Sequence, residues 1–379
     1  MTYLSYSVKV PGKLMIAGEY AVLEPNQKAV VAAVNRYVTA YIEPFSQNCI
    51  SLPQMELEDI TWEINDESIQ FSISDSRLGF IGNAIVSAVK FLKEKSVMLS
   101  PFKLQIKSQL DDPATGKKYG LGSSAAVVAA VISAVLYLHS AQLGILELDD
   151  IFKLSAIAHV KTQKSGSGAD IAAAVYGDWL EYSAFSAEWL LKQLDQEKIL
   201  TDIVKKTWPN LSIRSLTSPA NLQLAVGWTK ESAATAPMIQ KVHNFRCINF
   251  EAYSSFLKES QDSVSSLIRS FETNNCNGAI NALSQNRRTL RRLGENAGIS
   301  IETKELKTLC DIAENFGSGK PSGAGGGDCG IAFIIGKHKV QELYEAWQEA
   351  GIEPLDLCVS KTGIKVEVLK KVHLNFLNF

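Results

Sequence analysis

The sequence predicts an α+β protein in which an antiparallel sheet carries helices on one face. Strand-like segments with alternating or β-branched residues occur near both ends of the chain, and long amphipathic helical patterns lie between them. In the second half the order is strand, helices, strand, helix, strand, which is typical of an α+β arrangement. At 379 residues the chain is long enough for two domains.

The composition excludes several classes of partner. Lys and Arg number 38 against 40 Asp and Glu, without blocks of like charge, so neither nucleic acid nor an anionic membrane is an expected partner. No apolar run is long enough to span a bilayer, and no basic segment followed by an apolar run begins the sequence. The six cysteines lack metal-ligand spacing. We therefore expect a cytoplasmic protein, whose oligomeric state the composition leaves unknown.

The N-terminal segments predict strands that are separated by a turn. Ser5–Val10 alternates polar and apolar residues and predicts a strand that ends at Pro11-Gly12. Lys13 follows this turn, and a surface lysine is the simpler interpretation of this segment by itself. Two further strands are expected at Ala29–Val34 and Arg36–Glu43, whereas residues 46–75 give no clear pattern.

The most informative segment is residues 116–138, GKKYGLGSSAAVVAAVISAVLYL. Its glycine-rich turn, Gly120-Leu121-Gly122, runs into two serines and then into an apolar helix. Free N–H groups and the macrodipole favour an anion at a helix N-terminus, and glycine permits its close approach. The segment therefore predicts a phosphate-binding loop, and Lys117 and Lys118 add two cations before it. A small-residue helix without a ligand is the alternative.

Two other phosphate motifs fit this segment less well. No lysine followed by serine or threonine closes a GxxxxGK stretch, as the P-loop requires. The spacing Gly120-x-Gly122-x-x-Ala125 matches the loose dinucleotide fingerprint, but polar residues 111–119 separate it from the preceding strand, Phe102–Leu110. No acidic residue stands about twenty positions further on to bind a ribose. We therefore do not predict a dinucleotide site.

The rest of the first half predicts two helices, a second small-residue segment and a strand. Helical periodicity occurs at Phe80–Lys95 and Leu148–Val160, and Trp179–Phe185 is expected to be a strand. Between them, residues 164–172 are rich in glycine and serine. Asp170 in this segment is either the N-cap of a helix at Ile171–Tyr176 or a carboxylate that faces a phosphate or metal.

A mixed connector at residues 186–218 suggests a domain boundary, and we predict domains at residues 1–213 and 214–379.

A third glycine-rich segment, Pro321–Gly330, predicts a loop whose backbone approaches another group closely. Arg287, Arg288, Arg291 and Arg292 form a basic helix face that is either solvated or meets an anion. The remaining expected elements are a strand at Leu222–Trp228, helices at Glu251–Phe271, Ala279–Leu293 and Glu302–Asn315, a strand at Ile331–Ile335, a helix at Lys339–Ala350 and a strand at Gly363–Leu369.

The three glycine-rich segments in this order resemble those of the GHMP kinases, a superfamily that includes galactokinase, homoserine kinase, mevalonate kinase and phosphomevalonate kinase. The early segment is Lys9–Leu14 with Gly18-Glu19-Tyr20, the central one is Lys118–Ala126, and the late one is SGAGGGDCGIA at 322–332. The resemblance covers nearly the whole chain. The late segment looks most like that of the bacterial phosphomevalonate kinases, with Asp328 where mevalonate kinases usually have a further glycine.

This resemblance implies a two-domain GHMP kinase fold, with an N-terminal domain like ribosomal protein S5 domain 2, a ferredoxin-like C-terminal domain, and ATP, Mg²⁺ and the acceptor bound between them. Lys13 would be the catalytic lysine, Asp170 the catalytic carboxylate and Ser124 a magnesium ligand. Residues expected to bind the nucleotide are Lys118, Gly120, Leu121, Gly122, Ser123, Ser124 and Ala125. Residues expected to bind the acceptor are Gly12, Gly18, Glu19, Tyr20, Lys117, Ser167, Ser322, Gly323, Ala324 and Gly325.

One position departs from the mevalonate kinase pattern. Eleven positions before Asp170, where mevalonate kinases look to have a glutamate metal ligand, this chain has His159, which we expect to be a packed residue. The resemblance implies ATP-dependent phosphorylation of (R)-5-phosphomevalonate to 5-diphosphomevalonate in the mevalonate route to isoprenoids. Alternatives are a mevalonate kinase, another small-molecule kinase of the superfamily, or a nucleotide-binding sensor without catalysis.

Overall fold

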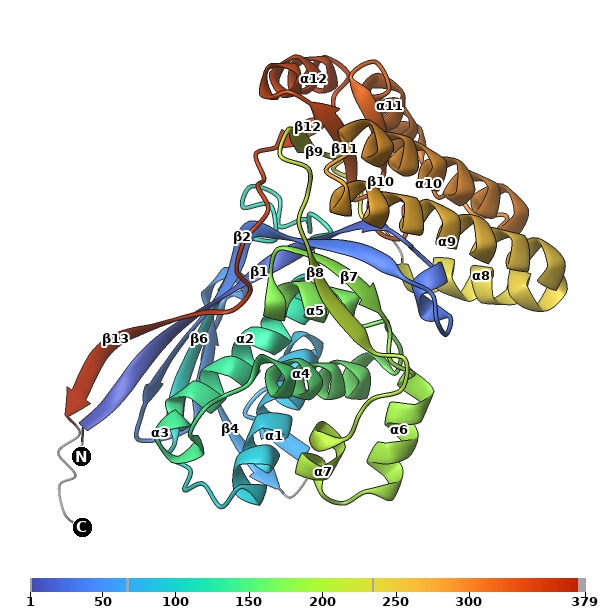
Figure 1. Ribbon diagram of the computed structural model, residues 1–379. Helices are drawn as coiled ribbons and strands as arrows, with labels where there is room; N and C mark the ends of the chain where they lie inside the picture. Colours follow the sequence, from blue (N-terminus) through green and yellow to red (C-terminus); the bar gives the residue numbers. More distant parts are fainter. Residues whose placement is uncertain (1, 66–67, 234, 374–379) are drawn as a thin grey trace, which may run out of the picture.

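Two sheets organise the chain, and helices pack against each of them (Figure 1). The computed structural model describes residues 2–65, 68–233 and 235–373. Among the described strands, β3 and β6 pair in parallel, whereas the other pairings are antiparallel. The α+β fold class predicted from the sequence is confirmed.

The first sheet is built on two long strands, β1 (Thr2–Ala17) and β2 (Ala29–Pro44). It continues from β2 through β6 (Phe102–Ser108), β3 (Cys49–Leu52), β4 (Leu57–Asn65) and β5 (Ser68–Phe71). On the other side of β1 lies β13 (Lys365–His373), and a branch from β2 carries β7 (Trp179–Ser183) and β8 (Ser212–Leu216). Short 3-10 turns occur at Ala21–Leu23, Pro53–Met55 and Ser76–Leu78.

Four helices cover one face of this sheet in Figure 1: α1 (Gly79–Glu94), α2 (Ser123–Leu138), α4 (Leu148–Gln163) and α5 (Ala169–Tyr176). Small side chains such as Ala126, Ala129 and Ala130 are fully buried in α2, so this helix packs closely against β1 and β2. The short helices α3 (Ser140–Leu143), α6 (Ala187–Gln196) and α7 (Leu200–Lys205) complete this layer.

The second sheet has the strand order β10 (Gly317–Pro321), β11 (Cys329–Ile335), β9 (Leu222–Trp228) and β12 (Glu353–Leu355). Its helices are α8 (Thr235–Ile248), α9 (Phe250–Glu272), α10 (Cys276–Ala297), α11 (Lys304–Ala313) and α12 (Lys337–Glu349). A strand, helices, two strands, a helix and a strand follow one another along the chain. This succession and strand order are those of a ferredoxin-like unit, as the family resemblance implies.

A continuous apolar core joins the two sheets. The rings of Trp179, Phe271 and Phe333 pack together, with centroids 5.2 to 6.2 Å apart, and they come from β7, α9 and β11. The first sheet also receives β13 from the end of the chain, and β8 crosses the expected boundary at residue 213. The division at 213 and 214 therefore stays a prediction, and the structure shows strands shared across it.

Several local predictions are corrected by the structure. The strand expected to end at Pro11-Gly12 continues to Ala17, because the pairing of β1 with β2 shifts register there and skips Asn35 and Arg36. For the same reason, the two strands expected at 29–34 and 36–43 are one irregular strand, β2. Arg287 is not part of a solvated basic face: its guanidinium is buried and pairs with Glu302, Asp311 and Glu314.

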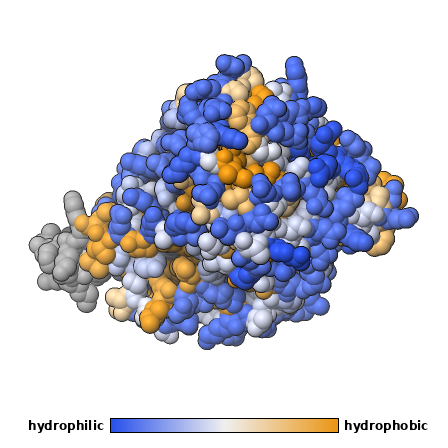
Figure 2. All heavy atoms as spheres, turned by 45° about the horizontal axis from the view of Figure 1, so that its top comes forward, coloured by the Kyte–Doolittle hydropathy of each residue, from blue (hydrophilic) through white to orange (hydrophobic). Residues whose placement is uncertain are grey.

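The surface gives little sign of a broad apolar interface on the side drawn in Figure 2, where apolar side chains form small separate groups on a hydrophilic face. Within the described residues, no helix is long and apolar enough to cross a membrane. The six cysteines, all of which lie in the described ranges, are free thiols.

Candidate active site

The three glycine-rich segments predicted from the sequence meet at the end of β1. The backbone N–H of Lys13 donates to the carbonyl of Leu121 in the central loop at 2.8 Å. The backbone N–H of Met15 donates to Oγ of Ser322 at 3.1 Å, and that hydroxyl donates back to the Met15 carbonyl at 2.9 Å. Residues more than a hundred positions apart are thus held against the same strand.

Gly122, the N-cap of α2, lies next to both of the predicted catalytic side chains. Its φ of 76° is left-handed, and a Cβ there would lie 3.0 Å from Cγ of Lys13 and 3.6 Å from Cβ of Asp170. Only a residue without a side chain leaves this space free. Lys13 and Asp170 therefore flank the start of α2, where free N–H groups and the helix dipole favour an anion.

Asp170 is not an N-cap. Helix α5 begins at Ala169 after Gly168, whose φ is 76°, and Asp170 lies within the first turn. Its Oδ1 accepts a hydrogen bond from the N–H of Ile171 at 3.0 Å. The carboxylate is half-buried and lines the cavity described next, which agrees with the second of the two interpretations left open by the sequence.

A cavity of about 220 Å³ opens beside this centre. It is lined by ten of the predicted site residues: Lys13, Glu19, Tyr20, Gly120, Ser167, Asp170, Ser322, Gly323, Ala324 and Gly325. It is also lined by residues that sequence reasoning did not assign to the site: Met15, Val22, Leu23, His159, Gln163, Gly166, Ala169, Thr235, Ile239 and Asp328. A sequence pattern could have pointed to two of these, His159 and Gln163. They are four residues apart and therefore share a face of α4, the helix that precedes the glycine- and serine-rich residues 164–172.

Several predicted residues do not line this cavity. Lys117 points to the carbonyl of Lys230, to which its Nζ donates at 3.1 Å, and Lys118 is exposed. Gly12 and Gly18 have packing roles, because a Cβ on either would lie within 3.0 Å of neighbouring backbone. Leu121, Gly122, Ser123, Ser124 and Ala125 form the turn and first residues of α2, behind Gly120.

Glu19 and Tyr20 join the cavity wall to the second half of the chain. Glu19 is buried and forms an ion pair with the buried Lys320. The hydroxyl of Tyr20 donates to the carbonyl of Ala324 at 2.6 Å, and burial next to Glu19 raises the pKa of that hydroxyl. The contacts of these two residues within the described chain are therefore structural links between β1 and the late glycine-rich loop.

Asp328 packs directly on the central loop. A Cβ on Gly120 would lie 2.5 Å from Cβ of Asp328 and 2.6 Å from its Oδ2. Asp328 itself has a left-handed φ of 56°, and its Oδ1 accepts a hydrogen bond from the N–H of Ala233 at 3.3 Å. Burial raises the pKa of this carboxyl, and the nearby charges of Lys13 and Lys118 oppose that rise.

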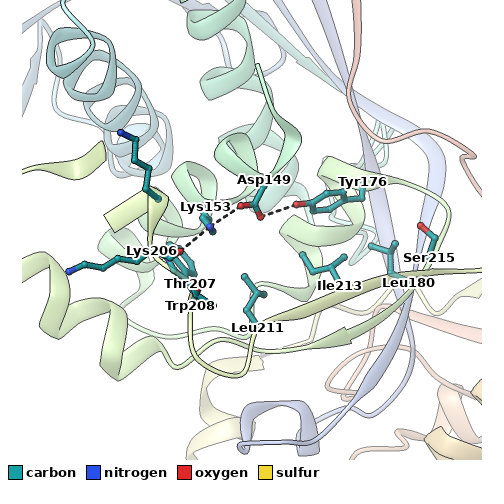
Figure 3. A pocket seen from close by; sticks show the side chains of 11 residues that line it. Asp149, Lys153, Tyr176, Leu180, Lys206, Thr207, Trp208, Leu211, Ile213 and Ser215 are labelled. Atoms are coloured by element: carbon teal, nitrogen blue, oxygen red, sulfur yellow. Dashed lines mark hydrogen bonds and ion pairs between the residues drawn. The ribbon is translucent and has the colours of Figure 1, made fainter. Parts of the chain in front are cut away.

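A second cavity, of about 360 Å³, lies at the opposite end of α4 and α5 (Figure 3). The carboxylate of Asp149 lies between Lys153, at 2.8 Å, and the hydroxyl of Tyr176, at 3.5 Å. Its apolar side is made by Leu180, Trp208, Leu211 and Ile213. None of the residues predicted to bind nucleotide or acceptor lines it, so we assign the candidate active site to the cavity beside Lys13.

Comparisons with known proteins bear on the family and the fold of the chain. Residues 83–178 match the family model for the GHMP kinases N terminal domain, and residues 267–353 match that for the GHMP kinases C terminal. The phosphomevalonate kinase of Streptomyces sp. strain CL190 is 31% identical over 368 residues, which cover 93% of this chain and 97% of that protein.

Two solved structures are similar over nearly their whole length. A Lin0012 protein from Listeria innocua is 36% identical with a TM-score of 0.88, and the match covers 97% of this chain and 99% of that one. Streptococcus pneumoniae phosphomevalonate kinase in complex with phosphomevalonate and AMPPNP is 29% identical with a TM-score of 0.81, covering 93% and 99%. The two sheets and their helices are thus arranged as in these two solved structures.

Proposed function

The chain belongs to the GHMP kinase family, and we propose that it transfers the γ-phosphoryl group of ATP to the phosphate of (R)-5-phosphomevalonate, forming 5-diphosphomevalonate. The observation that carries the proposal is the position of Lys13 and Asp170 next to Gly122, at the start of α2 and beside a cavity. The similarity to the Streptomyces and Streptococcus phosphomevalonate kinases supports this acceptor.

Lys13 has the central role in the proposed reaction. Phosphoryl transfer requires in-line positioning and neutralisation of charge more than covalent help from the protein. The ammonium group of Lys13, next to the N-terminus of α2, would stabilise charge on the group in transfer. Since the Lys13 backbone is hydrogen-bonded to Leu121, the lysine and the phosphate loop are held in one fixed arrangement.

Asp170 is proposed to orient Lys13 or the metal rather than to act as a base. The second ionisation of a phosphomonoester has a pKa of about 6, so the attacking oxygen of the acceptor is already an anion at neutral pH. A general base is then not required. In a relative that phosphorylates an alcohol, a carboxylate in this place would have a proton to remove.

The residues at the start of α2 fit a magnesium ion that is held partly by substrate. Within the described residues, no three His, Cys, Asp or Glu side chains are clustered so that they could bind a metal by themselves. Mg²⁺ generally uses one or two protein ligands together with phosphates and water; Ser124 would supply one at the start of α2, and Asp170 in the first turn of α5 would either orient the ion or orient Lys13. When bound, Mg²⁺ would neutralise charge on the β- and γ-phosphates of ATP.

Product analysis tests the proposal. The purified protein is incubated with Mg²⁺·ATP and either 5-phosphomevalonate or mevalonate, and products are followed by phosphorus NMR. We expect a new pair of diphosphate ester doublets from 5-phosphomevalonate and little or no product from mevalonate. A monoester formed from mevalonate would instead identify a mevalonate kinase, and nucleotide binding without turnover of either compound would identify a sensor.

The same assay tests Lys13. We expect Lys13→Met to lower kcat by at least ~10²-fold with a smaller effect on nucleotide affinity, as for an interaction made chiefly in the transition state. A kcat near that of the unchanged protein would mean that Lys13 has no catalytic role and is an ordinary surface lysine.

A further inference from the structure

Two side chains of α4 face the candidate active site with polar groups that are free to bind a ligand. His159 and Gln163 are one helical turn apart and both line the cavity. His159 is only 5% exposed, and its ring packs on Phe80 with centroids 5.0 Å apart. Among the described residues, neither ring nitrogen has a hydrogen-bond partner. The ring nitrogens are not among the buried polar atoms that lack a partner, so they are open to the cavity, where a ligand or water can bond to them.

The cavity belongs to the acceptor rather than to the nucleotide. Of the central loop, Gly120 lines it, whereas Ser123 and Ser124 at the start of α2 do not. The cavity is also lined by the late glycine-rich loop, Ser322–Gly325, and by Thr235 and Ile239 from the start of α8. Phosphates bound at the N-terminus of α2 would therefore reach this cavity only at its Gly120 edge, and the remaining space is left for the second substrate.

The charges of the cavity wall leave one place for a second anion. Lys13 lies beside Gly122 at the transfer centre, and the carboxylate of Glu19 is already paired with Lys320. The other two carboxylates of the wall lie near the central loop, Asp170 beside Gly122 and Asp328 beside Gly120. His159 lies elsewhere on the wall, next to Gly166 in the loop before α5: its Nδ1 is 3.9 Å from the position of a Cβ on that glycine. Besides the cation of Lys13, the wall thus carries an imidazole and an amide that can donate hydrogen bonds to another group of the ligand.

We propose that His159 and Gln163 bind the carboxylate of the acceptor, and that they select acceptors that carry one. This inference rests on the proposed function, in which the acceptor has a phosphate at one end and a carboxylate at the other. The phosphate meets Lys13, and the carboxylate accepts hydrogen bonds from the imidazole and from the side-chain amide. Loss of a hydrogen bond to a charged group in a desolvated site lowers affinity by about tenfold to a hundredfold.

The test combines a protein variant with a substrate variant. His159→Leu keeps an apolar group against Phe80 but removes both ring nitrogens, and Gln163→Ala removes an amide at a surface-exposed position. Thr162→Val is the matched control, because Thr162 lies in the same turn but bonds to Asn83 and to the Ala158 carbonyl. Each protein is assayed with 5-phosphomevalonate and with its primary amide, in which the carboxylate is replaced by a neutral carboxamide.

For the unchanged protein and for Thr162→Val, we expect the amide to have a KM at least ~10-fold above that of the acid. For His159→Leu, the KM of the acid rises by about the same factor, the preference for acid over amide falls below about threefold, and kcat and the KM of ATP change little. Gln163→Ala gives a smaller shift in the same direction.

Two results would overturn the inference. One is a His159→Leu protein that still prefers the acid as strongly as the unchanged protein does. The other is a Thr162→Val protein that loses the preference equally, because α4 would then act only as a support. If the unchanged protein phosphorylates no 5-phosphomevalonate, the proposed function fails together with this inference, and that failure is visible before any variant is made.

Discussion

Lys320 donates a hydrogen bond from Nζ to Oε1 of Glu19, and the two side chains are 0% and 2% exposed. Lys320 lies on β10 of the second sheet, and Glu19 follows β1 of the first. Nζ also donates to the carbonyl of Pro321 at 2.6 Å, whereas Oε2 of Glu19 has no hydrogen-bond partner within the described residues. The ion pair thus crosses between the two halves of the chain, directly behind the candidate active site.

Removal of one partner of this pair should cost more stability than removal of both. Lys320→Met leaves a buried carboxylate without a partner, and we expect the free energy of unfolding to fall by about 3–5 kcal/mol. The double variant Lys320→Met/Glu19→Leu should regain much of this loss, because no charge is then buried alone. Urea unfolding of each protein measures the difference.

An exposed pair provides the control for that prediction. Lys307 and Asp311 pair on the surface of α11, and both side chains are well exposed. Lys307→Met should cost less than about 1 kcal/mol. Equal losses for Lys320→Met and Lys307→Met would mean that burial of the Lys320 pair does not determine its energetic role.

Gly122→Ala should impair catalysis beyond its effect on stability. A Cβ at this position would press on Lys13 and strain a left-handed backbone. Gly116→Ala is the control, because Gly116 also has a left-handed φ, of 68°, but nothing lies within 4 Å of its added Cβ. We expect both variants to lose about 1–2 kcal/mol of stability and Gly122→Ala alone to lose at least ~10-fold in kcat. Similar kcat values in the two variants would show that the contact with Lys13 is not important.

The elements that the sequence predicted well are those with a strong local pattern. Helices α1, α9 and α10 and strand β9 were expected within a few residues of their observed bounds, because their apolar residues recur with the period of the element. Helix α8 was missed, since Pro237 lies in its first turn and only Val242 and Phe245 of its described residues are buried. The strands within residues 46–75 were also missed. Several residues of β4 and β5 face solvent, whereas β3 is buried but only four residues long.

Candidate site residues could be predicted from the sequence where they belong to a short motif. They could not be predicted where segments far apart in the sequence come together to form the cavity. The sequence and its resemblance pointed to the motif around Gly120–Ala125 and to Lys13 and Asp170, and the structure brings Lys13 and Asp170 together next to Gly122. Their roles in the site stay predictions. Thr235 and Ile239 line the cavity only because α8 packs near the late glycine-rich loop. The partnership of Glu19 with Lys320 joins positions 301 residues apart, which no local pattern reveals.

Ser124→Ala should weaken the use of Mg²⁺·ATP while the fold stays intact. The Ser124 side chain is half-buried in the first turn of α2, and no hydrogen bond from its hydroxyl to another described residue supports the fold. We expect a higher Mg²⁺ concentration for half-maximal activity, because one hydroxyl ligand is lost. Ser140→Ala, at the start of α3 and outside the cavity, is the control. Unchanged magnesium dependence in Ser124→Ala would remove this serine from the proposed site.

Asp328→Asn should stabilise the protein at neutral pH, and the gain should shrink as the solution becomes acidic. Burial raises the pKa of Asp328 in the folded state, above the value of about 3.9 for an unfolded aspartate. The protonated carboxyl therefore favours folding below the unfolded pKa, and this contribution is lost as the pH rises through the folded pKa. Asparagine has no charge to desolvate, and its carbonyl can still accept the hydrogen bond from Ala233.

The free energy of unfolding, measured in urea from about pH 4 to about pH 8, should thus differ between Asp328→Asn and the unchanged protein by an amount that grows with pH. Asp59→Asn is the control of opposite sign, because a hydrogen bond and charge from Lys103 lower the pKa of Asp59. The Asp59→Asn protein should therefore become less stable relative to the unchanged protein as the pH rises. A difference for Asp328→Asn that stays constant over this range, or that favours the aspartate at neutral pH, would mean that the anion of Asp328 is stabilised where it packs on Gly120.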